Sequence, residues 1–192
     1  MNDYGYLFNQ QELNVTNKVK GKSIIQNTKH EMLLLDRFKE LKSVMPDKIE
    51  NNSTIHLISS DNFGSIELLK YFIEKYNIIE LLITTWSYNN EFVQIIKNLN
   101  TDISIFIDKS MRTRKAALYN QIAELAVTGK IQMRVHHMIH SKITLIKTEN
   151  HYITIEASAN YSENQRIENY TITENNELFM FHKKWMSELI GK

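Results

Sequence analysis

An alternation of strands and helices between residues 54 and 127 constrains the fold of this chain more than any other feature. Short β-branched and aliphatic runs predict buried strands, and each run is followed by apolar residues at helical spacing. The expected strands are 55–59, 79–85 and 103–107, and the expected helices are 65–76, 91–99 and 115–127. This repeated order predicts a parallel arrangement of strands with helices packed on both faces.

The pattern changes after Gly129, because glycine is a residue that commonly ends a helix. Strands then follow in close succession, with a hairpin turn expected around 148–151 and an amphipathic helix at the end. Their expected ranges are 131–136, 143–147, 152–156 and 169–173 for strands, and 178–190 for the helix. The predicted class is α/β, with a mixed, largely parallel β-sheet flanked by helices on both faces.

The first part of the chain carries weaker signals. Residues 1–27 are polar and lack sustained periodicity, so we expect a flexible or irregular arm. From Thr28, apolar residues recur at helical spacing up to Pro46, which predicts a helix there. A chain of 192 residues is long enough for one core, and we expect 28–192 to form a single domain.

Composition excludes several classes of protein. The chain has no cysteine, which removes disulfides and thiol nucleophiles, and no apolar run long enough to cross a bilayer. No basic and then apolar leader follows Met1, so we expect a cytoplasmic protein that does not contact a membrane. The net charge of +1 means that binding to a polyanion requires local concentration of the basic residues.

Residues 134–172 gather the groups that carry chemistry. On an extended chain, His140 and Lys142 point to the same side, and a hairpin returns Ser158 and Asn160 beside them. An imidazole, an ammonium, a hydroxyl and an amide together suit an anionic phosphoryl centre. Glu168 follows a short polar loop, from which its carboxylate is expected to fix the tautomer of the imidazole.

This stretch resembles the signature of the phospholipase D superfamily, H-x-K-x4-D followed by G-S-x-N and a downstream acidic residue. His140 and Lys142 match H-x-K, Ser158 and Asn160 match S-x-N, and Glu168 matches the acidic position. The sequence of this segment is also similar to that of small, single-motif, nuclease-like members of the superfamily, of phage or mobile-element type. The sequence departs from the signature in two places, with Lys147 at the aspartate position and Ala157 at the glycine position.

The resemblance implies a phospholipase D-like fold and a displacement at phosphorus without metal or cofactor. One His140 would attack the phosphodiester to form a phosphohistidine, and a second histidine would protonate the leaving oxygen and then activate water. Lys142, Ser158 and Asn160 would stabilise charge on the non-bridging oxygens. Because the chain holds one motif, the resemblance implies a homodimer whose two copies of His140 share one composite site.

Other polar and aromatic residues are candidates for binding substrate. A basic cluster of Lys109, Arg112, Arg114 and Lys115 follows a predicted strand, at the sheet edge where α/β proteins bind ligands. Its residues either contact phosphates or form a solvated loop.

Three single residues are also candidates. Trp86 either stacks on a base or packs, and Arg166 either reaches a phosphate or makes a surface ion pair. His137 is expected at the mouth of the pocket. His136, His137 and His140 do not predict a metal site, since they lie on a strand and loop and lack the glutamate of zinc proteases.

Three hypotheses on function follow. The leading one is a metal-independent phosphodiesterase, most simply a nuclease that acts on DNA or RNA. Phospholipids are the rival substrate class, which would make the chain a phospholipid phosphodiesterase, although the sequence shows no basic amphipathic helix for membrane binding. The alternative from a different class is a catalytically inactive module that keeps the fold and binds nucleic acid.

Overall fold

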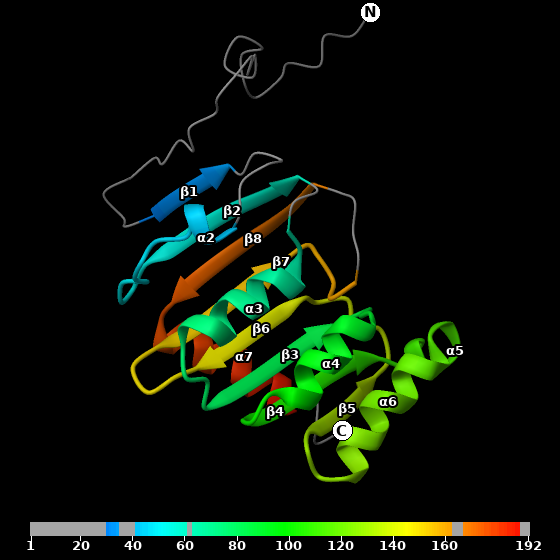
Figure 1. Ribbon diagram of the computed structural model, residues 1–192. Helices are drawn as coiled ribbons and strands as arrows, with labels where there is room; N and C mark the ends of the chain where they lie inside the picture. The colour runs from blue at the N-terminus through cyan, green and yellow to red at the C-terminus, as the bar shows by residue number, and fades with distance from the viewer. Residues whose placement is uncertain (1–29, 35–40, 61–62, 163–166, 189–192) are drawn as a thin grey trace, which may run out of the picture.

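The computed structural model describes residues 30–34, 41–60, 63–162 and 167–188. Within these ranges, eight strands form one sheet in the order β1-β2-β8-β7-β6-β3-β4-β5 (Figure 1). The strands are β1 (His30–Leu34), β2 (Thr54–Ser60), β3 (Glu80–Thr85), β4 (Asp102–Asp108), β5 (Gln132–His136), β6 (Ile143–Lys147), β7 (Tyr152–Ala157) and β8 (Ile167–Glu174). The helices are α2 (Leu41–Val44), α3 (Ser65–Lys75), α4 (Asn90–Asn98), α5 (Met111–Arg114), α6 (Ala116–Val127) and α7 (Asn176–Glu188).

The sheet is mixed, and most of its pairings are antiparallel. The pairs β1/β2, β3/β4 and β4/β5 are parallel, whereas β2/β8, β8/β7, β7/β6 and β6/β3 are antiparallel. The prediction of a largely parallel sheet is therefore wrong. The α/β class holds, but β6, β7 and β8 enter the centre of the sheet between β2 and β3, and each runs opposite to its neighbours.

The helix predicted from Thr28 is also wrong. Residues His30–Leu34 form strand β1, which pairs in parallel with β2, and the short helix α2 begins only at Leu41. The free edge of β2 supplies backbone hydrogen-bond partners, and this non-local pairing overrides a helical spacing of apolar residues. The arm predicted at 1–27 lies outside the described residues.

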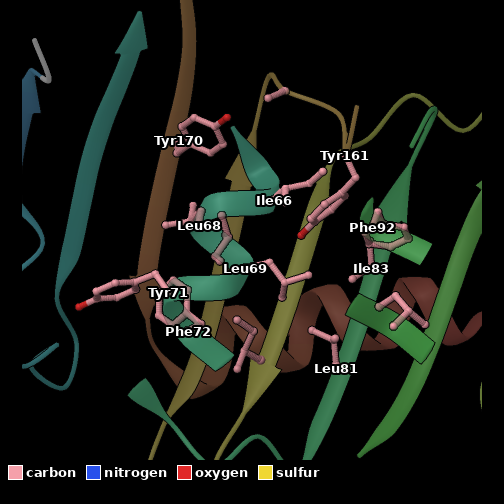
Figure 2. Close-up of a cluster of buried hydrophobic side chains, with 14 of the residues drawn as sticks. Ile66, Leu68, Leu69, Tyr71, Phe72, Leu81, Ile83, Phe92, Tyr161 and Tyr170 are labelled. Carbon is pink, nitrogen blue, oxygen red and sulfur yellow. The ribbon is translucent and has the colours of Figure 1, made fainter. Parts of the chain in front are cut away.

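Helices cover both faces of the sheet, as expected. On one face, α3 and α4 pack Leu68, Leu69, Phe72 and Phe92 against β3 and its neighbours (Figure 2). On the opposite face, Phe179 and Met186 of α7 pack against Leu82 and Leu145. Burial of these large side chains on both sides holds the central strands rigid.

One edge of the sheet collects the loops that matter for function. The pairing directions place the carboxyl ends of β2, β3, β4, β5 and β7 at this edge, together with the amino ends of β6 and β8. We call it the carboxyl edge. Residues just after the first set of strands and just before the second set therefore meet there.

Candidate functional site

The β6–β7 hairpin brings the two halves of the motif to the carboxyl edge. Its turn is closed by the amide of Thr148, which donates to the carbonyl of His151 at 3.0 Å. The register pairs Ile143 with Glu156, and the amide of Ala157 donates to the carbonyl of Lys142 at 3.0 Å. The hairpin expected from the sequence is present, and the segments around His140 and Ser158 leave the sheet side by side.

Lys142 and His140 are in direct contact. The Nζ of Lys142 lies 3.1 Å from Nδ1 and 3.3 Å from Nε2 of His140, and it donates to the carbonyl of His140 at 2.8 Å. Burial lowers the pKa of the Lys142 ammonium, and the charge of Glu168 opposes that shift. His140 is exposed, so its imidazole is open to a substrate arriving from solvent.

Ser158 and Glu168 tie the end of β7 to the beginning of β8. The Oγ of Ser158 donates to Oε2 of Glu168 and accepts from the amide of Asn169 at 3.0 Å. The amide of Ser158 in turn donates to the carbonyl of Asn169 at 3.0 Å. Glu168 is only 8% exposed, so its carboxylate is a buried charge beside Ser158 and within electrostatic reach of Lys142.

Asn160 is oriented by the end of β3. Its Oδ1 accepts from the amide of Trp86 at 3.2 Å and from the hydroxyl of Thr85 at 3.3 Å. These bonds fix the plane of the side-chain amide, whose Nδ2 group carries two donor hydrogens. All five residues of the predicted catalytic set therefore lie at the carboxyl edge.

Two residues that support this set were missed by the sequence analysis. The buried carboxylate of Asp108, at the end of β4, accepts from the amide of Ser110 at 2.9 Å, from the Ser110 hydroxyl, and from the amide of Ile139 at 3.0 Å. The hydroxyl of Thr84 accepts from Ser141 Oγ at 3.1 Å and from the amide of Ile143 at 3.0 Å. Together they anchor the chain on both sides of His140.

Asp108 is held as an anion. Burial alone would raise the pKa of its carboxyl group, but the hydrogen bonds from Ser110 and Ile139 and the charge of Arg114 together lower it below the ordinary value. The signal in the sequence was a polar residue at the end of a predicted strand, followed directly by the basic cluster. Such a position points to a ligand-binding edge, although it does not tell a supporting residue from a turn residue.

Trp86 links the motif to the basic cluster. Its ring centroid lies 6.2 Å from that of His140, and the guanidinium carbon of Arg114 lies 3.7 Å from the centre of the indole. The Nη2 of Arg114 also donates to the carbonyl of Trp86 at 2.9 Å. The indole is 36% exposed, so it is at the surface of the site and not within the core.

A groove of ≈ 660 Å³ lies beside Trp86 and is lined by two of the other candidates, Arg112 and His137. Its lining residues are Trp86, Asp108, Lys109, Ser110, Arg112, Thr113, His137 and Met138. Arg112 donates from Nε to the hydroxyl of Tyr119 at 2.8 Å, and Lys115 donates to the carbonyl of Tyr88 at 3.0 Å. Arg112 and His137 thus line the groove, Lys115 braces the chain after β3, and Arg166 lies outside the described residues.

The two departures from the signature do not disturb the site. Lys147 pairs with Glu80 at the beginning of β3, at the sheet edge opposite His140, and its Nζ lies 5.7 Å from the ring centre of Tyr152. Among the described non-glycine residues, positive φ occurs only at Asn52 and Met138. Ala157 therefore has a backbone conformation that does not require glycine.

Two features are absent from the part of the chain that the structure describes. It contains no group of three or more His, Asp or Glu side chains placed to hold a metal ion. It also contains no helix that is long and apolar enough to cross a membrane.

Comparison with known proteins gives structural matches alone, since no protein-family model and no curated protein sequence matches the chain. The polyphosphate kinase of Porphyromonas gingivalis matches with a TM-score of 0.58 and 13% identity, over 73% of this chain and 26% of that one. The phospholipase D family member Nuc of Salmonella typhimurium matches with a TM-score of 0.54 and 19% identity, over 70% of this chain and 92% of that one. TrmBL2, an archaeal chromatin protein with a novel mode of DNA binding, matches with a TM-score of 0.51 and 14% identity, over 77% of this chain and 55% of that one.

The lengths of these matches differ. The chain spans about a quarter of the polyphosphate kinase and about half of the archaeal protein, but nearly the whole of Nuc. At these identities the matches concern the fold. In its fold, the chain is similar to members of the phospholipase D family.

Proposed function

We propose that this chain is a metal-independent phosphodiesterase that cleaves nucleic acid through a phosphohistidine, at a site completed by a second copy of the chain. One observation carries the proposal. His140 and Lys142 before β6, Ser158 and Asn160 after β7, and Glu168 in β8 converge on one sheet edge beside a groove with basic residues.

In the first step, Nε2 of one His140 attacks phosphorus and forms the P–N bond. The bond from phosphorus to the leaving oxygen breaks, and that oxygen takes a proton from the imidazolium of the partner's His140. The ammonium of Lys142 and the donors of Asn160 stabilise the charge on the non-bridging oxygens. Lys142 suits this role because its Nζ already lies beside the ring of His140.

In the second step, the partner's His140 removes a proton from water, and the water oxygen attacks phosphorus. The P–N bond breaks, and both imidazoles return to their starting states. One chain supplies one His140 at its motif, so the cycle needs two chains. A two-fold axis next to His140 brings the identical groups together, which is how an isologous interface is built.

Nucleic acid is the substrate class that the surroundings of His140 favour. Lys109 and Arg112 line the groove, and Arg114 stands against Trp86 at its rim. Cations along a groove neutralise successive phosphates of a polyanion. This concentrates positive charge next to the motif in a chain whose net charge is only +1.

A second candidate, a nucleic-acid-binding module without catalysis, is favoured by a specific contact. Lys142 Nζ lies near both ring nitrogens of His140, and a lone pair used for that contact is not free to attack phosphorus. The module would bind phosphate with the same residues and release it unchanged.

The deciding experiment incubates the purified chain with labelled single- and double-stranded DNA and RNA in EDTA. The proposed enzyme cleaves in chelator, and His140→Ala abolishes cleavage, whereas the exposed His136→Ala does not. A phosphohistidine is labile in acid, so the intermediate is detected by quenching the reaction with a labelled substrate in alkali. Binding without cleavage in the wild-type chain supports the module, and cleavage that disappears in EDTA refutes the mechanism.

A further inference from the structure

Trp86 is held beside the proposed nucleophile by two independent anchors. Its amide donates to Oδ1 of Asn160 at 3.2 Å, so a motif residue fixes one side of its backbone. Its carbonyl accepts from Nη2 of Arg114 at 2.9 Å, so the basic cluster fixes the other side. The position of the indole is therefore set before any ligand arrives.

Arg114 is itself held in place. Its Nε donates to Oγ of Ser110 at 3.0 Å, and Ser110 donates to the buried carboxylate of Asp108. With its Cζ at 3.7 Å from the ring centre, the guanidinium covers one face of the indole. A cation fixed on one face makes the aromatic ring a rigid platform, because neither partner has to be ordered on binding.

Trp86 lines the groove, whereas Arg114 is not among the residues that line it. This groove, of ≈ 660 Å³, also presents His137 and the exposed side chain of Met138. A volume of this order is that of a site for a small molecule, which matches one or two nucleotides. The neighbouring Tyr88, by contrast, is completely buried, so of these two aromatic residues after β3 only Trp86 is exposed.

We infer that the groove binds single-stranded nucleic acid, and that Trp86 stacks on the base next to the phosphate held at His140. The inference rests on the proposed function, since it assumes that the phosphate of a nucleic acid lies at the motif. One sugar joins a base to its phosphate, so a base flanking that phosphate falls within reach of a ring 6.2 Å from His140. In a duplex, the neighbouring base pairs cover both faces of each base, so Trp86 can stack only on an unpaired or flipped base.

The test measures binding apart from cleavage, with the full chain carrying His140→Ala in EDTA. The probe is a fluorescein-labelled DNA strand of roughly 12 nucleotides, alone or annealed to its complement, followed by anisotropy. Adding Trp86→Ala should weaken binding of the single strand by about 5- to 100-fold and leave binding of the duplex unchanged. Trp86→Phe should restore most of the loss, because it keeps an aromatic face.

Phe181→Ala is the matched control, since Phe181 is an exposed aromatic residue on α7 and should leave both affinities unchanged. A strand of abasic deoxyribose phosphates gives a second measurement. It has no base on which Trp86 can stack, so Trp86→Ala should leave its affinity unchanged. Equal losses for single strand and duplex in Trp86→Ala, or no loss for the single strand, would overturn the inference. Cleavage by the wild-type chain is scored separately, so a failure of this inference is distinguishable from a failure of the proposed enzyme.

Discussion

The hydroxyl of Ser158 donates a hydrogen bond to the buried carboxylate of Glu168, which fastens the end of β7 to the beginning of β8. The charge of that carboxylate also acts on Lys142, since it opposes the lowering of the Lys142 pKa by burial. A neutral side chain of the same shape would keep the hydrogen bond to Ser158 and remove the effect of the charge on the pKa of Lys142.

Glu168→Gln should therefore lower the pKa of Lys142 further. If the Lys142 ammonium stabilises the phosphoryl group, kcat/KM declines as the pH rises through the pKa of Lys142, which is already below its ordinary value. In Glu168→Gln this decline should occur at a lower pH than in the wild type. Glu177→Gln, which changes an exposed residue of α7, is the control. If the decline of kcat/KM occurs at the same pH in Glu168→Gln as in the wild type, the role of Lys142 is contradicted.

A composite site should make activity depend on pairs of chains. When wild type is unfolded and refolded with an equal amount of His140→Ala, random pairing leaves both histidines in about one quarter of the dimers. The rate should then be about one quarter of that of the same total concentration of wild type, and independent sites would give about one half. A linear dependence on the wild-type fraction, or a monomer by light scattering, would refute the shared site.

Asp108→Asn should destabilise the chain at neutral pH by about 1–3 kcal/mol, because a buried acceptor of three hydrogen bonds is replaced by an amide. The pKa of Asp108 is lowered in the folded chain, so its stabilisation is present above the ordinary Asp pKa and is lost as the pH falls through the lowered value. The difference from wild type should shrink over that acidic range in urea unfolding. Asp102→Asn, exposed at the other end of β4, is the matched control.

Lys147→Asp restores the residue of the phospholipase D signature and should change the cleavage rate by less than about twofold. The side chain lies at the sheet edge opposite His140, so it cannot contact the phosphoryl group. Lys142→Met should instead lower kcat by about 10²- to 10³-fold, the usual effect of removing a donor from developing charge. A gain of tenfold or more in Lys147→Asp would show that the departure from the signature limits catalysis.

Local patterns predicted most single elements of this fold but not the sheet. The β6–β7 hairpin was predictable, since two strands joined by a short polar turn pair with each other. The position of β8 was not, because its partner β2 is more than a hundred residues away, as in the pair Ile55 and Ile172. Nothing in the periodicity of either segment specifies that partner, and the same holds for β1.

The candidate site shows a similar division. His140, Lys142, Ser158, Asn160 and Glu168 were predicted together because their spacing and types repeat a signature. Asp108 and Thr84 were missed, because each is a single polar residue whose importance depends on a backbone amide from another segment. Trp86 was ambiguous in the sequence, and only its contacts with Arg114 and Asn160 place it at the motif.

The place of β8 between β2 and β7 has a consequence for a chain that is still being translated. Until residue 174 has left the ribosome, β2 and β7 each expose an unpaired edge, and a nascent chain must avoid joining these edges to another copy. Glu168 arrives with the same strand, well after His140 and Lys142. The motif therefore becomes complete only when β8 is synthesised and can insert between β2 and β7.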